Sequence, residues 1–247
     1  MDSNIPSASE TLDQQNINTQ IQILKIVEKM DLELYNKQAS EFSKLELLPE
    51  KHVEYLYKLK NSGFEPKVIY DIGSNVLHWG SVAKKIWPNA EIILFEAYPL
   101  LEFLYSGYKY HIGCLSDSNN KIVKFYHNEY FPGGNSYYKE DSEHFTDNKY
   151  IEMKTSTLDN IVKQKKFPLP DLVKIDVQGA EIDILKGGIN SIGNAQRLIL
   201  ELQSVEYNKG AKLVTESLPI VESMGWKCED PLFCDNGPDG DYGFIKI

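Results

Sequence analysis

The part of the chain with the most chemical content is residues 171–181, where a single acid follows an apolar strand. The apolar residues between positions 172 and 177 predict a strand that carries Asp176 near its C-terminal end. Gly179 breaks this strand, and residues 180–185 predict a helix. In open α/β sheets, ligands bind at the carboxyl ends of the strands. Asp176 is therefore a candidate for binding or catalysis; the alternative is an acid that only caps the following helix.

Two more acids stand at the ends of predicted strands. Residues 68–72 predict a strand that carries Asp71, followed by a glycine turn and a helix over residues 82–87. Residues 91–96 predict a third strand with Glu96 at its tip. Asp71 and Glu96 lie 25 residues apart, close to the spacing at which a nucleotide-binding unit places an acid on the ribose hydroxyls. A carboxylate suits this role because an ionised acceptor forms the stronger hydrogen bonds.

The glycines after the first strand argue against a dinucleotide. The pyridine-dinucleotide fingerprint needs Gly-x-Gly-x-x-Gly, whereas this chain has Gly73 followed by Asn75, Leu77 and Gly80. The close-packed glycines that cradle a pyrophosphate are missing. A cofactor with a nucleoside and no pyrophosphate fits better, and S-adenosylmethionine has that shape.

These motifs together resemble a known family. Over roughly residues 67–247, the chain is similar to the FkbM-type S-adenosylmethionine-dependent methyltransferases. The most distinctive block is Asp171–Glu181. The other matching segments, in chain order, are Asp71–Asn75, Phe95–Glu96, Leu115–Asp117, Thr157–Asp159, Leu200–Gln203 and Glu206–Asn208.

The resemblance implies an α/β fold of the class I methyltransferase (Rossmann-like) type: a seven-stranded mixed sheet with helices on both faces, preceded here by N-terminal helices. It implies that Glu96 holds the ribose of S-adenosylmethionine and that Asp176 faces the methionine amino group or the acceptor. The whole implied cofactor-binding set is Asp71, Gly73, Ser74, Asn75, Glu96, Ala97, Ser116, Asp117 and Asp176. Family members methylate hydroxyl groups on sugars, glycans and natural products.

The chain departs from the family pattern at two positions. Leu77 stands where relatives usually have a second glycine, and Gln178 stands where many carry Glu. A side chain at position 77 is expected to narrow the space for the methionine tail, because glycine is used where backbone meets ligand closely. Three interpretations follow: Gly80 takes over the role, the pocket is reshaped but active, or binding is impaired. We favour the second.

The chemistry of O-methylation requires a base. A sugar hydroxyl is a poor nucleophile until its proton is taken, and alignment of nucleophile, methyl and sulfur supplies much of the rate. The candidate bases are Asp176 first, then Glu201 on the neighbouring strand, then His78 and His144. Asp176 and Glu201 could instead bind Mg²⁺ together, with the metal lowering the pKa of the hydroxyl.

Composition restricts the partners. The formal net charge of −10 argues against a nucleic-acid backbone, which demands clustered Lys and Arg. No run of 18 apolar residues predicts a membrane span, and residues 1–20 lack the apolar core of a secretory signal. The three cysteines fit a reducing compartment, and we expect free thiols. The acceptor is therefore expected to be a sugar or small-molecule hydroxyl, and the location cytoplasmic.

The chain divides into three predicted parts. Residues 1–16 are polar and predict a disordered tail, residues 17–65 a helical extension, and residues 66–247 the methyltransferase domain. The extension includes a helix over residues 51–61 that begins near Pro49. Its apolar stripe could pack on the chain's own domain, which most amphipathic helices do, or pair two protomers into a homodimer.

Two loops carry further expectations. Residues 121–127 predict an exposed strand, and the loop 128–150 mixes aromatic and polar residues suited to a sugar, so we interpret it as a lid over the acceptor. Near the C-terminus, strands over residues 226–233 and 242–247 flank a segment rich in Asp, Asn, Gly and Pro. That composition favours a turn over a calcium loop, whose spacing it does not match.

Two other classes of function remain open. One is a nicotinamide-dependent oxidoreductase or epimerase, which the missing glycines disfavour. The other is a catalytically impaired methyltransferase-fold binding protein, which Leu77 suggests. A fold does not determine a function, so the two alternatives are separated from the methyltransferase only by the site.

Overall fold

The computed structural model describes residues 49–128, 132–146 and 149–247. The predicted tail over residues 1–16 and the start of the predicted extension, residues 17–48, lie outside the described residues. The division of the chain at residues 16 and 65 stays a prediction.

A seven-stranded mixed sheet forms the centre of the described part of the chain. Its order is β3-β2-β1-β7-β8-β10-β9. All neighbouring strands pair in parallel except β10, which is antiparallel to both β8 and β9. The strands are β1 (Val68–Ile72), β2 (Glu91–Glu96), β3 (Lys109–Ile112), β7 (Leu172–Ile175), β8 (Arg197–Gln203), β9 (Trp226–Asp235) and β10 (Asp239–Lys246). The predicted class I methyltransferase fold is confirmed.

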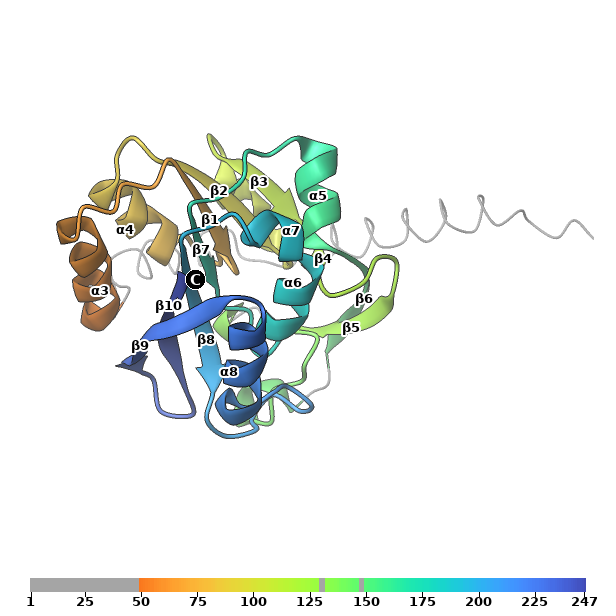
Figure 1. Cartoon of the computed structure of the whole chain (residues 1–247). Helices are drawn as coiled ribbons and strands as arrows, with labels where there is room; N and C mark the ends of the chain where they lie inside the picture. Colours follow the sequence, from red (N-terminus) through yellow and green to blue (C-terminus); the bar gives the residue numbers. More distant parts are fainter. Residues whose placement is uncertain (1–48, 129–131, 147–148) are drawn as a thin grey trace, which may run out of the picture. The chain divides into compact units, whose positions relative to one another are not determined.

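Helices cover both faces of this sheet (Figure 1). On one face lie α3 (Glu50–Asn61), α4 (His78–Ile86) and the 3-10 helix η1 (Pro99–Tyr105). On the other lie α5 (Leu158–Lys165), α6 (Glu181–Gly187), α7 (Ile189–Ile192) and α8 (Val214–Ser223). The central strands are apolar on both sides because each side is packed: in β7, all four residues are buried. Among the described residues, no helix is both long enough and apolar enough to cross a membrane.

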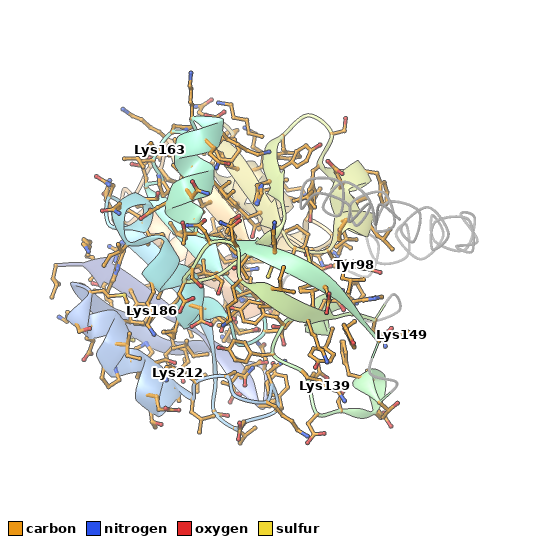
Figure 2. All side chains as sticks on the ribbon, turned by 90° about the vertical axis from the view of Figure 1, so that its right-hand side faces the viewer. Tyr98, Lys139, Lys149, Lys163, Lys186 and Lys212 are labelled. Atoms are coloured by element: carbon orange, nitrogen blue, oxygen red, sulfur yellow. The ribbon has the colours of Figure 1, made fainter. Side chains whose placement is uncertain are left out.

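A smaller sheet lies beside the main one, with order β4-β6-β5. Figure 2 looks onto this sheet, whose longer strands run across the view. Its strands are β4 (Cys114–Leu115), β5 (Ile122–Tyr126) and β6 (Tyr150–Ser156). The predicted strand over residues 121–127 is confirmed as β5. The described parts of the loop that follows hold two 3-10 turns, η2 (Pro132–Gly134) and η3 (Glu143–Phe145).

Two boundaries differ from the sequence predictions. The helix after β1 begins at His78 rather than at residue 82, because Leu77 adopts a left-handed backbone (φ 68°) that lets the chain enter the helix early. The C-terminal strands are longer than predicted, so only residues 236–238 connect them. Asp239 and Asp241 therefore belong to a strand, where the sequence interpretation placed them in a turn.

Helix α3 packs on the chain's own domain. Leu56 is fully buried in the core between α3, α4 and the sheet. The ring of Tyr55 stacks on Phe233 of β9, with ring centroids 4.0 Å apart. His52 Nε2 and Asp241 Oδ2 of β10 form a 2.8 Å hydrogen bond. The predicted helix over residues 51–61 is confirmed, and it is held by both apolar and polar contacts. Dimerisation through the N-terminal helices stays a prediction.

This packing predicts unequal effects of two adjacent substitutions in α3. Leu56→Ala should lower the free energy of unfolding by about 2–5 kcal/mol, because it leaves a cavity in a filled core. Tyr57→Ala is the matched control: Tyr57 is 51% exposed, and its loss should change stability by only about 0.5 kcal/mol. Urea unfolding of the full chain measures both. Equal, small effects would show that α3 does not share the core.

Candidate functional site

The parallel strands bring the predicted acids to one edge of the sheet. Asp176 follows β7 directly, Glu201 lies in β8, and Glu96 ends β2. Strands β2, β1, β7 and β8 are consecutive neighbours in the sheet and run in the same direction. Their carboxyl ends therefore meet at the edge where ligands of α/β sheets bind.

Gly73 allows the turn after β1 to lie against the end of β7. It has a left-handed backbone (φ 81°), and a Cβ at this position would lie 1.8 Å from the backbone oxygen of Asp176. The amide of Asp176 in turn donates a 3.0 Å hydrogen bond to the carbonyl of Ile72. Only a residue without a side chain fits this contact, so Gly73 determines how close the two strand ends come.

A buried lysine lies among the acids. The Lys174 ammonium is 2.9 Å from Asp176 Oδ2 and 3.7 Å from Asp71 Oδ1. Burial alone would lower the pKa of Lys174, but the two carboxylates outweigh it and raise that pKa. Burial raises the pKa of Asp71 to about 6, with Lys174 opposing the rise. Burial alone would raise the pKa of Asp176, but the nearby ammonium of Lys174 outweighs burial and lowers that pKa.

Glu201 behaves in the opposite way from Asp176. Burial and the negative charge of Asp176 raise the pKa of Glu201 well above its usual range. The ammonium of Lys174 lowers the pKa of Asp176, so the pKa values of the two acids are shifted in opposite directions. Glu201 is therefore the acid of the pair that keeps its proton to the higher pH.

Gln178 joins this pair to a tyrosine. Its amide nitrogen is 2.6 Å from Glu201 Oε2 and 3.4 Å from Asp176 Oδ1. Its amide oxygen accepts a 2.7 Å hydrogen bond from the hydroxyl of Tyr207. A glutamate could not donate to the acids in this way. Gln178 is therefore an adaptation to its neighbours.

Tyr207 also contacts Asp239. The Tyr207 hydroxyl donates to Asp239 Oδ2 as well as to the amide oxygen of Gln178, so two acceptors share its one hydrogen. Burial raises the pKa of Asp239, the hydrogen bond from Tyr207 opposes the rise, and the negative charges of Asp176 and Asp241 add to it. Asp239 is thus linked through Tyr207 and Gln178 to the acid pair.

Two cavities open at this edge of the sheet. The first is bordered by Glu96, Ala97, Leu115 and Tyr137. The second is bordered by His52, His78, Trp79, two residues of β10 and one residue of the turn before it. Gly73, Asn75, Asp176 and Glu201 border both. The acid pair therefore stands where the two cavities meet.

Glu96 lies in the first cavity as the sequence predicts for a ribose ligand. Its two oxygens accept hydrogen bonds from the backbone amides of Asn75 (2.9 Å) and Tyr98 (2.8 Å). Burial raises the pKa of Glu96 and these amides oppose the rise. The amides fix the carboxylate and leave further lone pairs for two hydroxyls. Leu115, Phe125 and Ile184 give the same cavity an apolar wall, so the residues present suit a nucleoside.

The other predicted cofactor residues are distributed unevenly. Ala97 borders the first cavity, and Ser74 borders the second, with its hydroxyl bonded to the carbonyl of Asp71 at 2.7 Å. Asp71, Ser116 and Asp117 border neither. Asp71 instead lies behind the edge beside Lys174. Contacts of Ser116 and Asp117 with adenine stay a prediction.

Leu77 does not narrow the first cavity, contrary to the expectation from its sequence. It borders neither cavity and packs instead against the core on the α3 and α4 face. Gly80 does not replace the missing glycine, because it faces Asp71: a Cβ there would lie 2.9 Å from Asp71 Oδ2. Leu77 stands at the position where relatives usually have glycine. It adopts a left-handed backbone there, and its side chain packs into the core.

The described part of the loop over residues 128–150 borders the first cavity. Pro132, Gly133, Asn135, Ser136 and Tyr137 border the first cavity, and none of the loop's described residues borders the second. These residues form a wall of the cavity that holds Glu96, and the role of the loop as a lid over the acceptor stays a prediction. Among the histidines proposed as bases, His78 borders the second cavity, whereas His144 is exposed in η3.

Several residues that border the second cavity were not predicted from the sequence, among them His52, Lys174, Asn236, Asp239 and Asp241. The alternation of Asp239 and Asp241 ahead of an apolar strand is the period-two signal that could have found two of them. Within the described residues, His52, Cys234 and Asp241 bring possible metal ligands within 4.8 Å of one another. His52 and Asp241 already bond directly, and all three cysteines are free thiols, as expected.

Comparison with known proteins identifies the family. The model of the Methyltransferase FkbM domain matches residues 71–228, which is more than half of the chain. The chain belongs to the FkbM methyltransferase domain family. A curated relative, the hexuronic acid methyltransferase AglP of Haloferax volcanii, is 33% identical over 68 residues. That match spans 27% of this chain and 28% of the relative.

Solved structures resemble this FkbM domain only distantly. A precorrin-6y C5,15-methyltransferase from Geobacter metallireducens has a TM-score of 0.46 at 15% identity, covering 83% of this chain and 91% of that one. Human N-acetylserotonin methyltransferase in complex with SAM has a TM-score of 0.40 at 8% identity, covering 79% of this chain and 55% of that one. The fold assignment rests on the strand order itself.

The contact between Gly73 and Asp176 predicts a strong effect of a single methyl group. Gly73→Ala should lower the free energy of unfolding by about 1–3 kcal/mol more than Gly107→Ala. The two glycines have similar left-handed backbones (φ 81° and 89°). An alanine at either position therefore suffers the same backbone strain, about 1–3 kcal/mol, and this cost cancels in the comparison. A Cβ at Gly107 meets nothing within 4 Å. Urea unfolding compares them, and equal losses would refute the close approach.

Proposed function

We propose that this FkbM-family protein transfers a methyl group from S-adenosylmethionine to a hydroxyl group of a sugar. The observation that carries the proposal is the acid pair Asp176–Glu201 at the junction of two cavities. One cavity suits a nucleoside, and the other is polar. A group that takes a proton thus stands between the place for a cofactor and the place for an acceptor.

The first cavity would hold S-adenosylmethionine. Glu96 would bind the ribose hydroxyls, the wall with Leu115 and Ile184 would cover the adenine, and Asp176 would face the positively charged methionine end. When bound, the cofactor supplies an electrophilic methyl group. Gly73 and Asn75 border both cavities and would keep the passage between them narrow, which favours the alignment that transfer requires.

The acid pair would take the proton of the acceptor hydroxyl. Asp176 is ionised but stabilised by Lys174, so it is the weaker base of the two. Glu201 holds its proton to a higher pH, and once ionised it is the stronger base. We assign Glu201 as the base, Asp176 as the group that orients the acceptor hydroxyl, and Lys174 as a positioning residue. His78 is the remaining candidate, at the border of the second cavity.

The sugar acceptor is supported by two observations. The curated relative acts on a hexuronic acid, although it matches only part of this chain. The second cavity is bordered mainly by groups that form hydrogen bonds with hydroxyls, among them Asn236, Asp239 and Trp79. A Mg²⁺ ion between Asp176 and Glu201 is the less favoured mechanism, because the ammonium of Lys174 already supplies positive charge to Asp176.

The alternatives lose their main support in the site. The impaired binding protein was suggested by Leu77, whose side chain lies in the core and away from both cavities. The dinucleotide enzyme needs glycines that Gly80 does not supply. A cytoplasmic location and the absence of nucleic-acid partners stay predictions.

Cofactor binding is the first test. Isothermal titration with S-adenosylhomocysteine should give binding that Glu96→Gln weakens by roughly tenfold or more, since one oxygen acceptor for the ribose hydroxyls is lost. Glu91→Gln is the matched control, at the opposite end of the same strand and exposed to solvent on its side chain (40%). Binding that Glu96→Gln leaves intact, with the fold intact, would contradict the assigned cavity.

The pH dependence tests the base. Because Glu201 must lose its proton to act and its pKa is raised, the rate of transfer should rise with pH through a limb above the ordinary range of glutamate. Glu201→Gln should abolish this limb and lower kcat by about 10²–10⁴-fold. Asp176→Asn should move the limb to lower pH, because it removes the negative charge that raises the pKa of Glu201.

Methyl transfer from radiolabelled S-adenosylmethionine, measured over pH, reads out these changes. His78→Gln serves as the comparison. A limb that persists in Glu201→Gln but disappears in His78→Gln would assign the base to His78 instead. Circular dichroism at each pH separates unfolding from loss of the base.

A further inference from the structure

The two cavities are built from different parts of the chain. Every residue that borders the first cavity lies between positions 72 and 201, inside the segment 71–228 that matches the family. The second cavity also takes residues from outside that segment: Pro49 and His52 before it, and Asn236, Asp239 and Asp241 after it. The family segment thus accounts for the whole first cavity, whereas Pro49 and α3, the turn at Asn236 and strand β10 complete the second.

Acidic side chains outnumber lysines and arginines around the second cavity. Four carboxylic acids border it: Asp176, Glu201, Asp239 and Asp241. Lys174 is the only lysine or arginine among the described residues that border it, and it already contacts Asp71 and Asp176. His52 and Asn236 both bond to Asp241. Lys174 is thus already paired with acids, and the described lining offers an anionic ligand no other lysine or arginine.

Two residues that border the second cavity each have a buried polar atom without a hydrogen-bond partner. Trp79 and His52 are only 3% and 4% exposed, and Trp79 Nε1 and His52 Nδ1 have no hydrogen-bond partner. A buried polar atom without a hydrogen-bond partner destabilises the protein, and a hydroxyl group of a ligand would supply the missing partner. Donors and acceptors of this kind, beside carboxyl groups, match a molecule rich in hydroxyls and without negative charge.

We propose that the second cavity selects an uncharged sugar or polyol and rejects sugars that carry a carboxylate, and that Asp239 and Asp241, supplied from outside the family segment, set this preference. The inference rests on the proposed function. It separates this chain from the relative that acts on a hexuronic acid. A substrate carboxylate placed here would lose its water and face other acids without a counter-ion.

Paired sugars test the selection. The full-length protein is first titrated with S-adenosylhomocysteine, and methyl transfer is then measured to methyl β-glucopyranoside and to methyl β-glucuronide, which have the same ring and differ by one carboxylate. We expect the glucoside to be preferred by roughly tenfold or more. Asp241→Asn keeps an oxygen that can accept from His52 and Asn236 but removes the charge, so the preference should narrow through a gain for the glucuronide.

Two further variants complete the test. Asp239→Asn should narrow the preference in the same direction and serves if Asp241→Asn fails to fold. Glu222→Gln, on the exposed surface of α8, also removes one acidic residue and should leave the preference unchanged. Failure of the parent protein to bind S-adenosylhomocysteine would overturn the proposed function itself. A protein that binds it and yet prefers the glucuronide, or methylates neither sugar, or keeps its preference in both Asn variants, would overturn only this inference.

Discussion

The burial of the Lys174 ammonium between Asp71 and Asp176 is the interaction on which the active edge depends. Asp71 lies in β1, whereas Lys174 and Asp176 lie in and directly after β7, so the contact joins the two central strands at the point where the turn at Gly73 crosses them. Neither oxygen of Asp71 has a side-chain or backbone partner at hydrogen-bond distance. Removing the ammonium would therefore leave buried carboxylates without compensation, a change that is strongly destabilising.

The remaining acids follow from that one charge. Lys174 lowers the pKa of Asp176, and the negative charge of Asp176 contributes to the raised pKa of Glu201 beside it. Gln178 can then donate to both acids and accept from Tyr207, which in turn contacts Asp239. The chain of contacts runs from β7 through β8 to β10, so the protonation of the site and the position of the last strand are coupled. A network of this kind is stable only when each member has its partner.

The sequence predicted the parts of this arrangement that local patterns encode. Strands β1, β2 and β7 are apolar runs that end beside an acid, so Glu96 and Asp176 could be placed at the sheet edge from composition and order alone. Asp239 and Asp241 were missed because the Asp, Asn, Gly and Pro residues around them also form turns. Pairing with β8, which the local sequence does not reveal, makes this segment a strand. The position of Leu77 could not be judged from its size, since the direction of its side chain depends on a left-handed backbone that sequence patterns do not reveal.

The split between family segment and flanking elements has a physical reason. Around the first cavity, Gly73 lies against Asp176 so closely that a methyl group does not fit, and Glu96 is held by two backbone amides, so little can change there without moving the strands. Helix α3 and β10 meet the second cavity from outside, and the Tyr55–Phe233 stack and the His52–Asp241 bond hold α3 on the C-terminal strands. The backbone of β10 also pairs with β8, with Asp241 opposite Glu201, so the strand pairing fixes the position of the flank beside the acid pair. Side chains on α3 and β10 can therefore vary with the acceptor as long as this backbone pairing is kept.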